Sequence, residues 1–305
     1  MQRRELILGG AAALAWSCAR KSAPTTGREV TLVLPAQPTR DGAGVKLNRA
    51  LGQRALGMLD PFLLLDEFHT ENPDDYIAGF PEHPHRGFET VTYMIHGAME
   101  HRDSVGNAGR LSPGSAQWMT AGRGIVHSEM PKQERGLMWG FQLWVNLPAQ
   151  RKMIPPRYQD IAPALIPEVA LEKGKLRVVA GTAEGKTGPV SGIDVDPLFV
   201  DLSLEKGHVI ALPVPTAHSS FLYVTEGSIR VGDSRREVRA QELAVLGPGS
   251  EVRFEGENGR ALLFAGRPLG EPVSRMGPFV MNTDAEIRQA VDDYRSGRLV
   301  IPVSQ

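Results

Sequence analysis

The chain has 305 residues, 41% of them hydrophobic, which is enough for two domains with ordinary cores and excludes collagen-like and disordered classes. Its 34 Lys and Arg residues nearly balance its 35 Asp and Glu residues. This balance argues against nucleic acid as a partner, because binding to a phosphate backbone needs a strongly basic surface. The single cysteine, Cys18, excludes an intramolecular disulfide.

The first 27 residues have the layout of an export signal. Arg3 and Arg4 precede an apolar run over residues 6–19, and a polar stretch follows. The paired arginines resemble a twin-arginine signal, the type that exports folded proteins. Two processing routes are open: lipidation of Cys18, or plain cleavage near Ala19. Both predict a mature protein in the periplasm or anchored to a membrane as a lipoprotein, whereas a misassigned start codon would leave it cytoplasmic. No later segment is long and apolar enough for a transmembrane span.

From Val30 onward, short β-branched and aromatic runs separated by Gly and Pro predict an all-β fold of the barrel or sandwich type. The clearest predicted strands cover 30–34, 87–95, 117–120, 138–145, 177–180, 198–204, 208–212, 220–224, 228–231, 243–246 and 261–265.

A helical pattern appears only near the C-terminus. Thr283 and Glu286 have the spacing of a capping box, and Gly297 is a good stop signal. We expect a helix from there to about Ser296, packed across a barrel mouth or back onto the first domain.

The strands fall into two blocks separated by a proline-rich crossover over residues 148–167. The sequence therefore predicts an N-terminal domain over residues 28–165 and a C-terminal domain over residues 166–305.

Two triplets in the first block offer metal ligands: His83-Pro84-His85 and His127-Ser128-Glu129. Alternate residues of a strand share one face, so two neighbouring strands could aim all four ligands into one barrel lumen. Three imidazoles and a carboxylate suit a divalent first-row transition metal. We expect Fe²⁺, and Mn, Ni or Cu would also be compatible.

Glu89 competes with Glu129 for the carboxylate position, because a period of two continued from His83 and His85 puts Glu89 on their face. We rank Glu129 first and expect Glu89 beside the ligands, where it could orient an imidazole. The other histidines lack a paired spacing or have the opposite parity, and ordinary surface or hydrogen-bonded roles are predicted for them: His69, His96, His101, His208 and His218.

Both blocks contain a turn glycine, Gly97 or Gly227, and later a Pro-Gly turn, Pro113-Gly114 or Pro248-Gly249. The repeat indicates duplication of one barrel. In this register the second-block counterparts of His83 and His85 are about Pro213 and Pro215. The second barrel is therefore expected to lack a metal set.

Three segments together resemble the signature of the pirin family within the cupin superfamily: residues 80–93, residues 117–131, and residues 277–283 before the predicted helix. The resemblance extends from about Val30 to the end of the chain. It implies a bicupin, two face-to-face β-barrels of the jelly-roll type with a short C-terminal helix and a metal only in the first barrel. The implied ligands are His83, His85, His127 and Glu129, with iron the usual metal.

The resemblance also implies two kinds of function. Some pirins resemble quercetin 2,3-dioxygenases, which open a flavonol with O₂, and here Glu129 would take the substrate hydroxyl proton. A small planar aromatic and O₂ are then the expected partners. The alternative is a non-catalytic, metal-dependent binding or regulatory protein with a protein partner in the groove between the barrels. A substrate unrelated to flavonoids is also open. The export signal departs from most pirins and favours catalysis over regulation of transcription.

Overall fold

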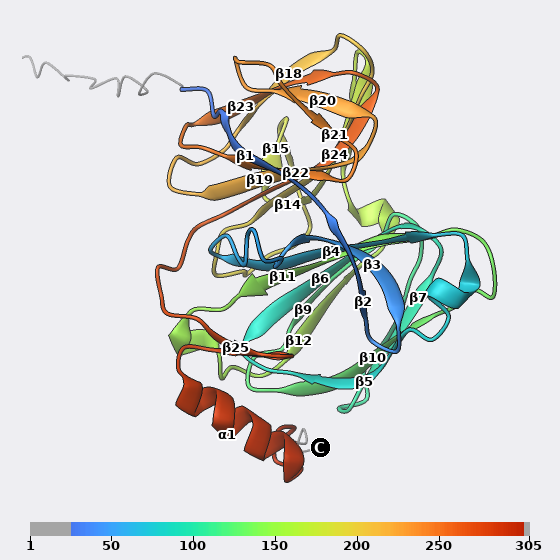
Figure 1. The fold of residues 1–305 in the computed structure, drawn as a ribbon, viewed down its shortest axis with the longest axis vertical. Helices are drawn as coiled ribbons and strands as arrows, with labels where there is room; N and C mark the ends of the chain where they lie inside the picture. Colours follow the sequence, from blue (N-terminus) through green and yellow to red (C-terminus); the bar gives the residue numbers. More distant parts are fainter. Residues whose placement is uncertain (1–25, 302–305) are drawn as a thin grey trace, which may run out of the picture.

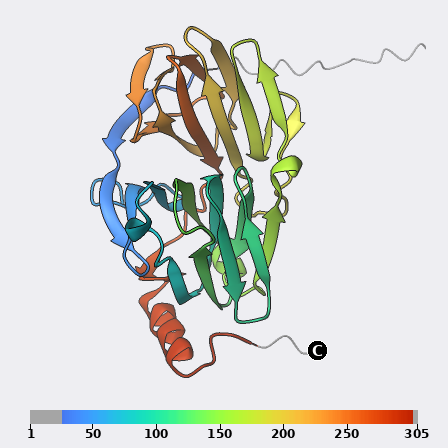
Figure 2. The same cartoon turned by 90° about the vertical axis from the view of Figure 1, so that its right-hand side faces the viewer.

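The structure is a computed structural model that describes residues 26–301. Residues 1–25 of the expected export signal, including the paired arginines and Cys18, lie outside the described residues. Two β-barrels lie one above the other, and one helix lies below the lower barrel (Figures 1 and 2). The predicted all-β bicupin architecture is confirmed.

Each barrel consists of one seven-stranded and one four-stranded antiparallel sheet. The first barrel has the strand order β12-β9-β6-β11-β4-β3-β2 in its large sheet and β5-β10-β7-β8 in its small sheet. Their bounds are β2 (Gln37–Asp41), β3 (Val45–Leu51), β4 (Phe62–Thr70), β5 (Phe80–His85), β6 (Phe88–His96), β7 (Met99–Asp103), β8 (Ala108–Leu111), β9 (Ala116–Thr120), β10 (Ile125–Pro131), β11 (Met138–Asn146) and β12 (Arg157–Ile161).

The second barrel repeats this arrangement, with β1-β22-β19-β24-β17-β14-β13 in the large sheet and β18-β23-β20-β21 in the small one. Their bounds are β1 (Val30–Pro35), β13 (Glu168–Leu171), β14 (Gly174–Ala180), β17 (Leu198–Leu204), β18 (Val209–Pro213), β19 (Ser219–Glu226), β20 (Ser228–Val231), β21 (Arg236–Arg239), β22 (Glu242–Leu246), β23 (Glu251–Gly256) and β24 (Gly259–Gly266).

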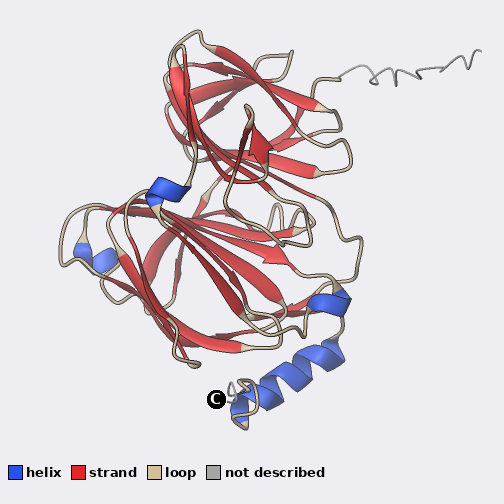
Figure 3. Ribbon diagram, turned by 180° about the vertical axis from the view of Figure 1, so that it is seen from behind, coloured by secondary structure: helices blue, strands red, loops and turns tan. Residues whose placement is uncertain are grey.

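Shorter elements complete the fold (Figure 3). They are the hairpins β15 (Thr182–Ala183) with β16 (Lys186–Thr187) and β25 (Ser274–Met276) with β26 (Phe279–Met281), the 3₁₀ helices η1 (Pro73–Asp75), η2 (Ala149–Arg151) and η3 (Pro163–Leu165), and the helix α1 (Asp284–Arg295). The capping box of Thr283 and Glu286 is present at the start of α1, as predicted. No helix within the described range is long and apolar enough to cross a membrane.

Each end of the described chain contributes elements to the barrel that the other half of the sequence forms. Residues 28–165 were assigned to the N-terminal domain, but the structure pairs β1 with β22 in the second barrel. In the other direction, the segment after β24 runs back to the first barrel, where β25, β26 and α1 lie (Figure 1). The sequence assignment placed β1 wrongly, because strand pairing between distant segments leaves no local signal.

The two seven-stranded sheets face each other across a large shared apolar core. Tyr93 and Phe141 of the first barrel pack there with Phe199, Phe221 and Phe264 of the second. Burial of this much apolar surface makes the two barrels one structural unit.

Buried polar bonds also cross this interface. Glu67 is fully buried, and its carboxylate accepts hydrogen bonds from the Trp139 indole at 2.9 Å and from the Tyr223 hydroxyl at 2.7 Å. Tyr223 belongs to the second barrel, so the hydrogen bonds of Glu67 link the two seven-stranded sheets.

Replacing Tyr223 with Phe tests this tie. The change leaves one buried carboxylate oxygen without its donor, and we expect the free energy of unfolding to fall by about 1.5–3 kcal/mol. Tyr294→Phe is the matched control because Tyr294 is 42% exposed. Urea unfolding monitored by tryptophan fluorescence measures both. Equal stability of the two variants would show that the bond between barrels contributes nothing.

Candidate metal centre

Three of the four predicted ligands meet in the lumen of the first barrel. His83 and His85 lie on β5 and His127 on the neighbouring β10, where His127 is directly opposite His83. One ring nitrogen from each of the three histidines lies within 4.8 Å of the others, and the Nε2 atoms of His83 and His85 are 3.0 Å apart. Within residues 26–301 this is the only group of three or more such side chains placed to hold one metal ion.

The imidazoles are turned toward one another. The Nδ1 atom of His83 lies 2.8 Å from the carbonyl oxygen of Pro81. A carbonyl can only accept, so Nδ1 donates, and the Nε2 atom of His83 is the ring nitrogen that faces His85. Burial, together with the neighbouring imidazoles, lowers the pKa values of His85 and His127 well below their usual range.

Several imidazole nitrogens have no protein partner. Nδ1 of His85 and both ring nitrogens of His127 are buried without a hydrogen bond. Unpaired buried nitrogens are costly, and neutral imidazole is a preferred ligand of first-row metals. The residues present therefore fit a divalent metal bound between the three rings.

Glu129 lies in the same lumen but outside the three-histidine group. Its carboxylate accepts a hydrogen bond from the Thr92 hydroxyl at 3.0 Å and another from the Gln142 amide at 2.8 Å. The Trp144 indole donates to the Gln142 oxygen at 3.0 Å, which fixes the orientation of that amide. The sequence reasoning missed Thr92 and Gln142, because their proximity depends on pairing between β6 and β11.

The structure corrects the expected position of Glu89. Gly87 adopts a φ of +88° between β5 and β6, so the alternation of faces does not continue from His85 into β6. Thr92 of β6 reaches Glu129 in the lumen, whereas Tyr93 points into the core between the barrels. Glu89 has the parity of Tyr93 and accepts a hydrogen bond from Thr120 at 2.6 Å. Glu89 therefore contacts no imidazole.

His101 is a further neighbour of the candidate centre that the sequence did not predict. It was predicted to have an ordinary surface or hydrogen-bonded role, but it is 1% exposed and lies opposite Glu129 in the pairing of β7 with β10. Its ring stacks on Tyr158, with centroids 5.1 Å apart, and its Nε2 lies 3.5 Å from a carboxylate oxygen of Asp160. His101 thus forms one wall of the lumen beside the candidate centre.

Aromatic rings form another wall. The Trp144 ring centroid lies 5.4 Å from that of His85 and 4.4 Å from that of Phe88. Three other large aromatic residues of the first barrel, Trp118, Trp139 and Tyr93, lie in the core between the barrels instead. Trp144 and Phe88 therefore give the centre an apolar, planar side.

The second barrel has no comparable group among the described residues. Its lumen holds an apolar cluster that includes Leu202, Leu212 and Phe254. The strand pairing also shifts the predicted register. In the second barrel the lumen-facing residues of β18 are Ile210, opposite Phe254, and Leu212, opposite Val252, as His83 lies opposite His127 and His85 opposite Ile125. The counterparts of His83 and His85 are therefore Ile210 and Leu212, rather than Pro213 and Pro215.

The duplication signal itself needs correction. Pro113-Gly114 precedes β9, whereas Pro248-Gly249 follows β22, the strand that takes the place of β9 in the second barrel. The two Pro-Gly turns are therefore not equivalent, although the barrels are.

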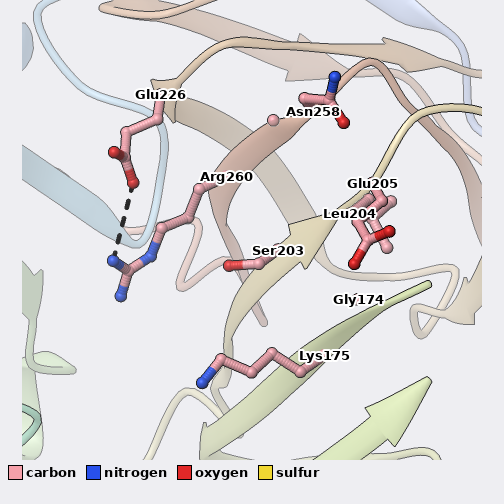
Figure 4. A pocket seen from close by; sticks show the side chains of 9 residues that line it. Gly174, Lys175, Ser203, Leu204, Glu205, Glu226, Asn258 and Arg260 are labelled. Carbon is pink, nitrogen blue, oxygen red and sulfur yellow. Dashed lines mark ion pairs between the residues drawn. The ribbon is translucent and has the colours of Figure 1, made fainter. Parts of the chain in front are cut away.

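A charged groove of about 460 Å³ on the second barrel contains none of the predicted site residues (Figure 4). Its central cation, Arg260, is paired with Asp201 at 2.7 Å and with Glu226 at 3.9 Å. Asp201 also accepts a hydrogen bond from the Tyr93 hydroxyl of the first barrel at 2.7 Å. These charges therefore satisfy one another and belong to the polar contacts between the two barrels.

A pH series tests the assignment of Glu89. Burial raises the pKa of Glu89 to about 7 from its ordinary value of 4.5. Between pH 4.5 and pH 7 the folded state therefore binds more protons than the unfolded state. The free energy of unfolding consequently falls as the pH rises through this range. Glu89→Gln cannot ionise, so we expect it to match the wild type near pH 4.5 and to exceed its stability by about 3 kcal/mol above pH 7.

Metal content provides the control for this variant. Since Glu89 contacts no imidazole, Glu89→Gln should bind as much metal as the wild type, whereas His127→Ala should bind less. Elemental analysis of dialysed protein measures both. A stability difference that does not change with pH, or loss of metal from Glu89→Gln, would contradict the placement of Glu89.

Comparison with known proteins agrees with this architecture. Residues 44–145 match the family model described as Pirin, and residues 199–300 match the Pirin C-terminal cupin domain. A Pseudomonas aeruginosa protein named "Putative quercetin 2,3-dioxygenase" is 49% identical over 284 residues, covering 91% of this chain and all of that protein. Human pirin is 40% identical over 279 residues, covering 90% of this chain and 94% of that protein. The crystal structure of a quercetin 2,3-dioxygenase from Acinetobacter baumannii superposes with a TM-score of 0.84 at 35% identity, covering 90% of this chain and 99% of that one. The chain belongs to the pirin family of cupin proteins.

Proposed function

We propose that the protein is a metal-dependent dioxygenase that opens a flavonol such as quercetin, or a related planar aromatic, with O₂. The observation that carries this proposal is the convergence of three imidazoles beside a buried carboxylate and an aromatic wall. The names of the bacterial relatives point to the same reaction class.

His83, His85 and His127 would hold the metal, with Glu129 as the predicted fourth ligand. Fe²⁺ is the metal we expect, and Mn, Ni and Cu are compatible with a nitrogen and oxygen ligand set. When bound, such a metal supplies Lewis acidity toward substrate oxygens and one-electron redox chemistry toward O₂.

Glu129 is the residue we assign to proton transfer. One of its carboxylate oxygens would take the proton of the substrate hydroxyl, leaving the substrate as an anion. Thr92 and Gln142 each donate a hydrogen bond to this carboxylate, and Gln142 is itself held by Trp144. These bonds fix the position of Glu129 before the substrate arrives.

Trp144 and Phe88 would bind the substrate through its flat apolar face. Both are buried, and both lie within 5.4 Å of His85 measured between ring centroids. Apolar walls of this kind exclude water, which strengthens the electrostatic interactions of the buried carboxylate.

Oxygen consumption by Fe²⁺-loaded protein with quercetin tests the reaction. We expect turnover in the wild type and a loss of about 100-fold or more in kcat for Glu129→Gln, because an amide cannot accept the proton. Glu134→Gln, at an exposed position, is the matched control. Absence of oxygen uptake with every flavonol tested would reject the dioxygenase. A Glu129→Gln variant with wild-type kcat would reject the role of Glu129.

We further propose that the chain is exported as a folded protein, based on Arg3, Arg4 and the apolar run that follows. Arg3→Lys with Arg4→Lys should retain the protein in the cytoplasm, while Arg20→Lys should leave export unchanged. Fractionation of cells expressing each variant, followed by immunoblotting, measures the distribution. An identical distribution for all three proteins would contradict export by this signal.

A further inference from the structure

One cation stands at the aromatic side of the candidate centre. The guanidinium carbon of Arg275 lies 4.6 Å from the centroid of the Trp144 ring, within the range of a cation–π contact. Trp144 is only 8% exposed, and its ring lies 5.4 Å from that of His85. Arg275 itself is exposed to solvent. The residue therefore connects the outside of the barrel with the wall of the lumen.

The donors of Arg275 are free. Within residues 26–301, no hydrogen bond or ion pair joins the Arg275 side chain to another residue, although charged groups lie nearby. Asp66 is engaged by Arg49, with contacts of 2.7 and 2.8 Å, and Arg49 also pairs with Asp41 at 3.3 Å. Asp66 and Asp41 lie within electrostatic range of Arg275, but both make their contacts with Arg49, so the guanidinium N–H donors of Arg275 have no acceptor among the described residues.

The C-terminal segment holds Arg275 in place. In the hairpin of β25 and β26, Arg275 lies opposite Val280, which packs with Trp144 and Phe88. Val280 is fixed in turn. Its amide donates to the Arg86 carbonyl at 3.0 Å, and its carbonyl accepts from the buried Lys152 ammonium at 3.1 Å.

Gly87 permits this close approach. A Cβ atom added at Gly87 would lie 1.9 Å from the Val280 carbonyl oxygen, so only glycine lets the segment pack beside the metal-binding strand. The position of Arg275 is therefore set by Arg86 and Gly87, between β5 and β6, and by Lys152, directly after η2.

A guanidinium whose N–H donors have no acceptor, placed beside an aromatic wall, suits one ligand class. A planar aromatic can pack on Trp144 or on the guanidinium plane, and a negatively charged oxygen on it would receive the free N–H donors. A neutral aromatic of the same shape would receive only the stacking contact. The difference between the two is the interaction that Arg275 adds.

We propose that Arg275 is a specificity-determining residue that selects planar aromatic anions, such as deprotonated phenols, enols or aromatic carboxylates, at the mouth of the candidate centre. The inference rests on the proposed function for the location of the binding site. It adds the charge of the preferred ligand and a residue that no part of the metal site requires.

Binding of 2-naphthoate and of its neutral isostere 2-naphthamide tests this inference without turnover. Isothermal titration calorimetry on metal-free protein and on Zn²⁺-loaded protein gives both dissociation constants. We expect the wild type to bind 2-naphthoate about tenfold more tightly than 2-naphthamide. Arg275→Gln should lose that preference by weakening the binding of 2-naphthoate about tenfold more than that of 2-naphthamide, since one charge-assisted contact corresponds to about this factor.

Two control variants separate charge from structure. Arg275→Lys keeps the charge and should retain part of the preference for the anion, and Arg295→Gln removes an exposed arginine elsewhere and should retain all of it. Thermal unfolding and metal content confirm that each variant is folded. Equal affinity of the wild type for the two probes, failure to bind either, or an unchanged preference in Arg275→Gln would overturn the inference. If flavonols support no oxygen uptake but the preference depends on Arg275, the dioxygenase fails and this inference stands.

Discussion

The structure depends on three imidazoles that converge in one lumen, two of them buried. This arrangement is unfavourable by itself, because His127 has no protein partner for either ring nitrogen and His85 has none for Nδ1. A cation bound between the rings would offset part of that cost. The surrounding residues serve this constraint: the Pro81 carbonyl sets the tautomer of His83, and Thr92 and Gln142 hold Glu129 beside the histidines.

The two barrels share one architecture and differ in what fills the lumen. The second barrel packs Leu, Val and Phe side chains in its interior, so it needs no ligand for stability. It supports the first barrel through the shared apolar core, the Glu67–Tyr223 bond and the return of the C-terminal segment. Through that segment, the end of the chain contributes Arg275 to the rim of a site whose ligands lie more than 140 residues earlier.

Local patterns in the sequence predicted a large part of this arrangement. Period-two spacing correctly put His83 and His85 on one face, and the Thr283–Glu286 capping box fixed the start of α1. The same period does not continue past Gly87, because the positive φ of this residue interrupts the alternation of faces. Glu89 therefore lies on the other side of the sheet from the three histidines. Contacts between distant strands could not be inferred. This is why β1 was assigned to the wrong barrel, and why Gln142, His101 and Arg275 were not recognised as neighbours of the centre.

The most direct test of the account is anomalous diffraction from crystals of metal-loaded protein, recorded at the iron, nickel and copper edges. The account predicts one anomalous peak, bounded by the ring nitrogens of His83, His85 and His127, and no peak in the lumen of the second barrel. A metal-loaded crystal whose peak lies away from these three histidines would contradict it.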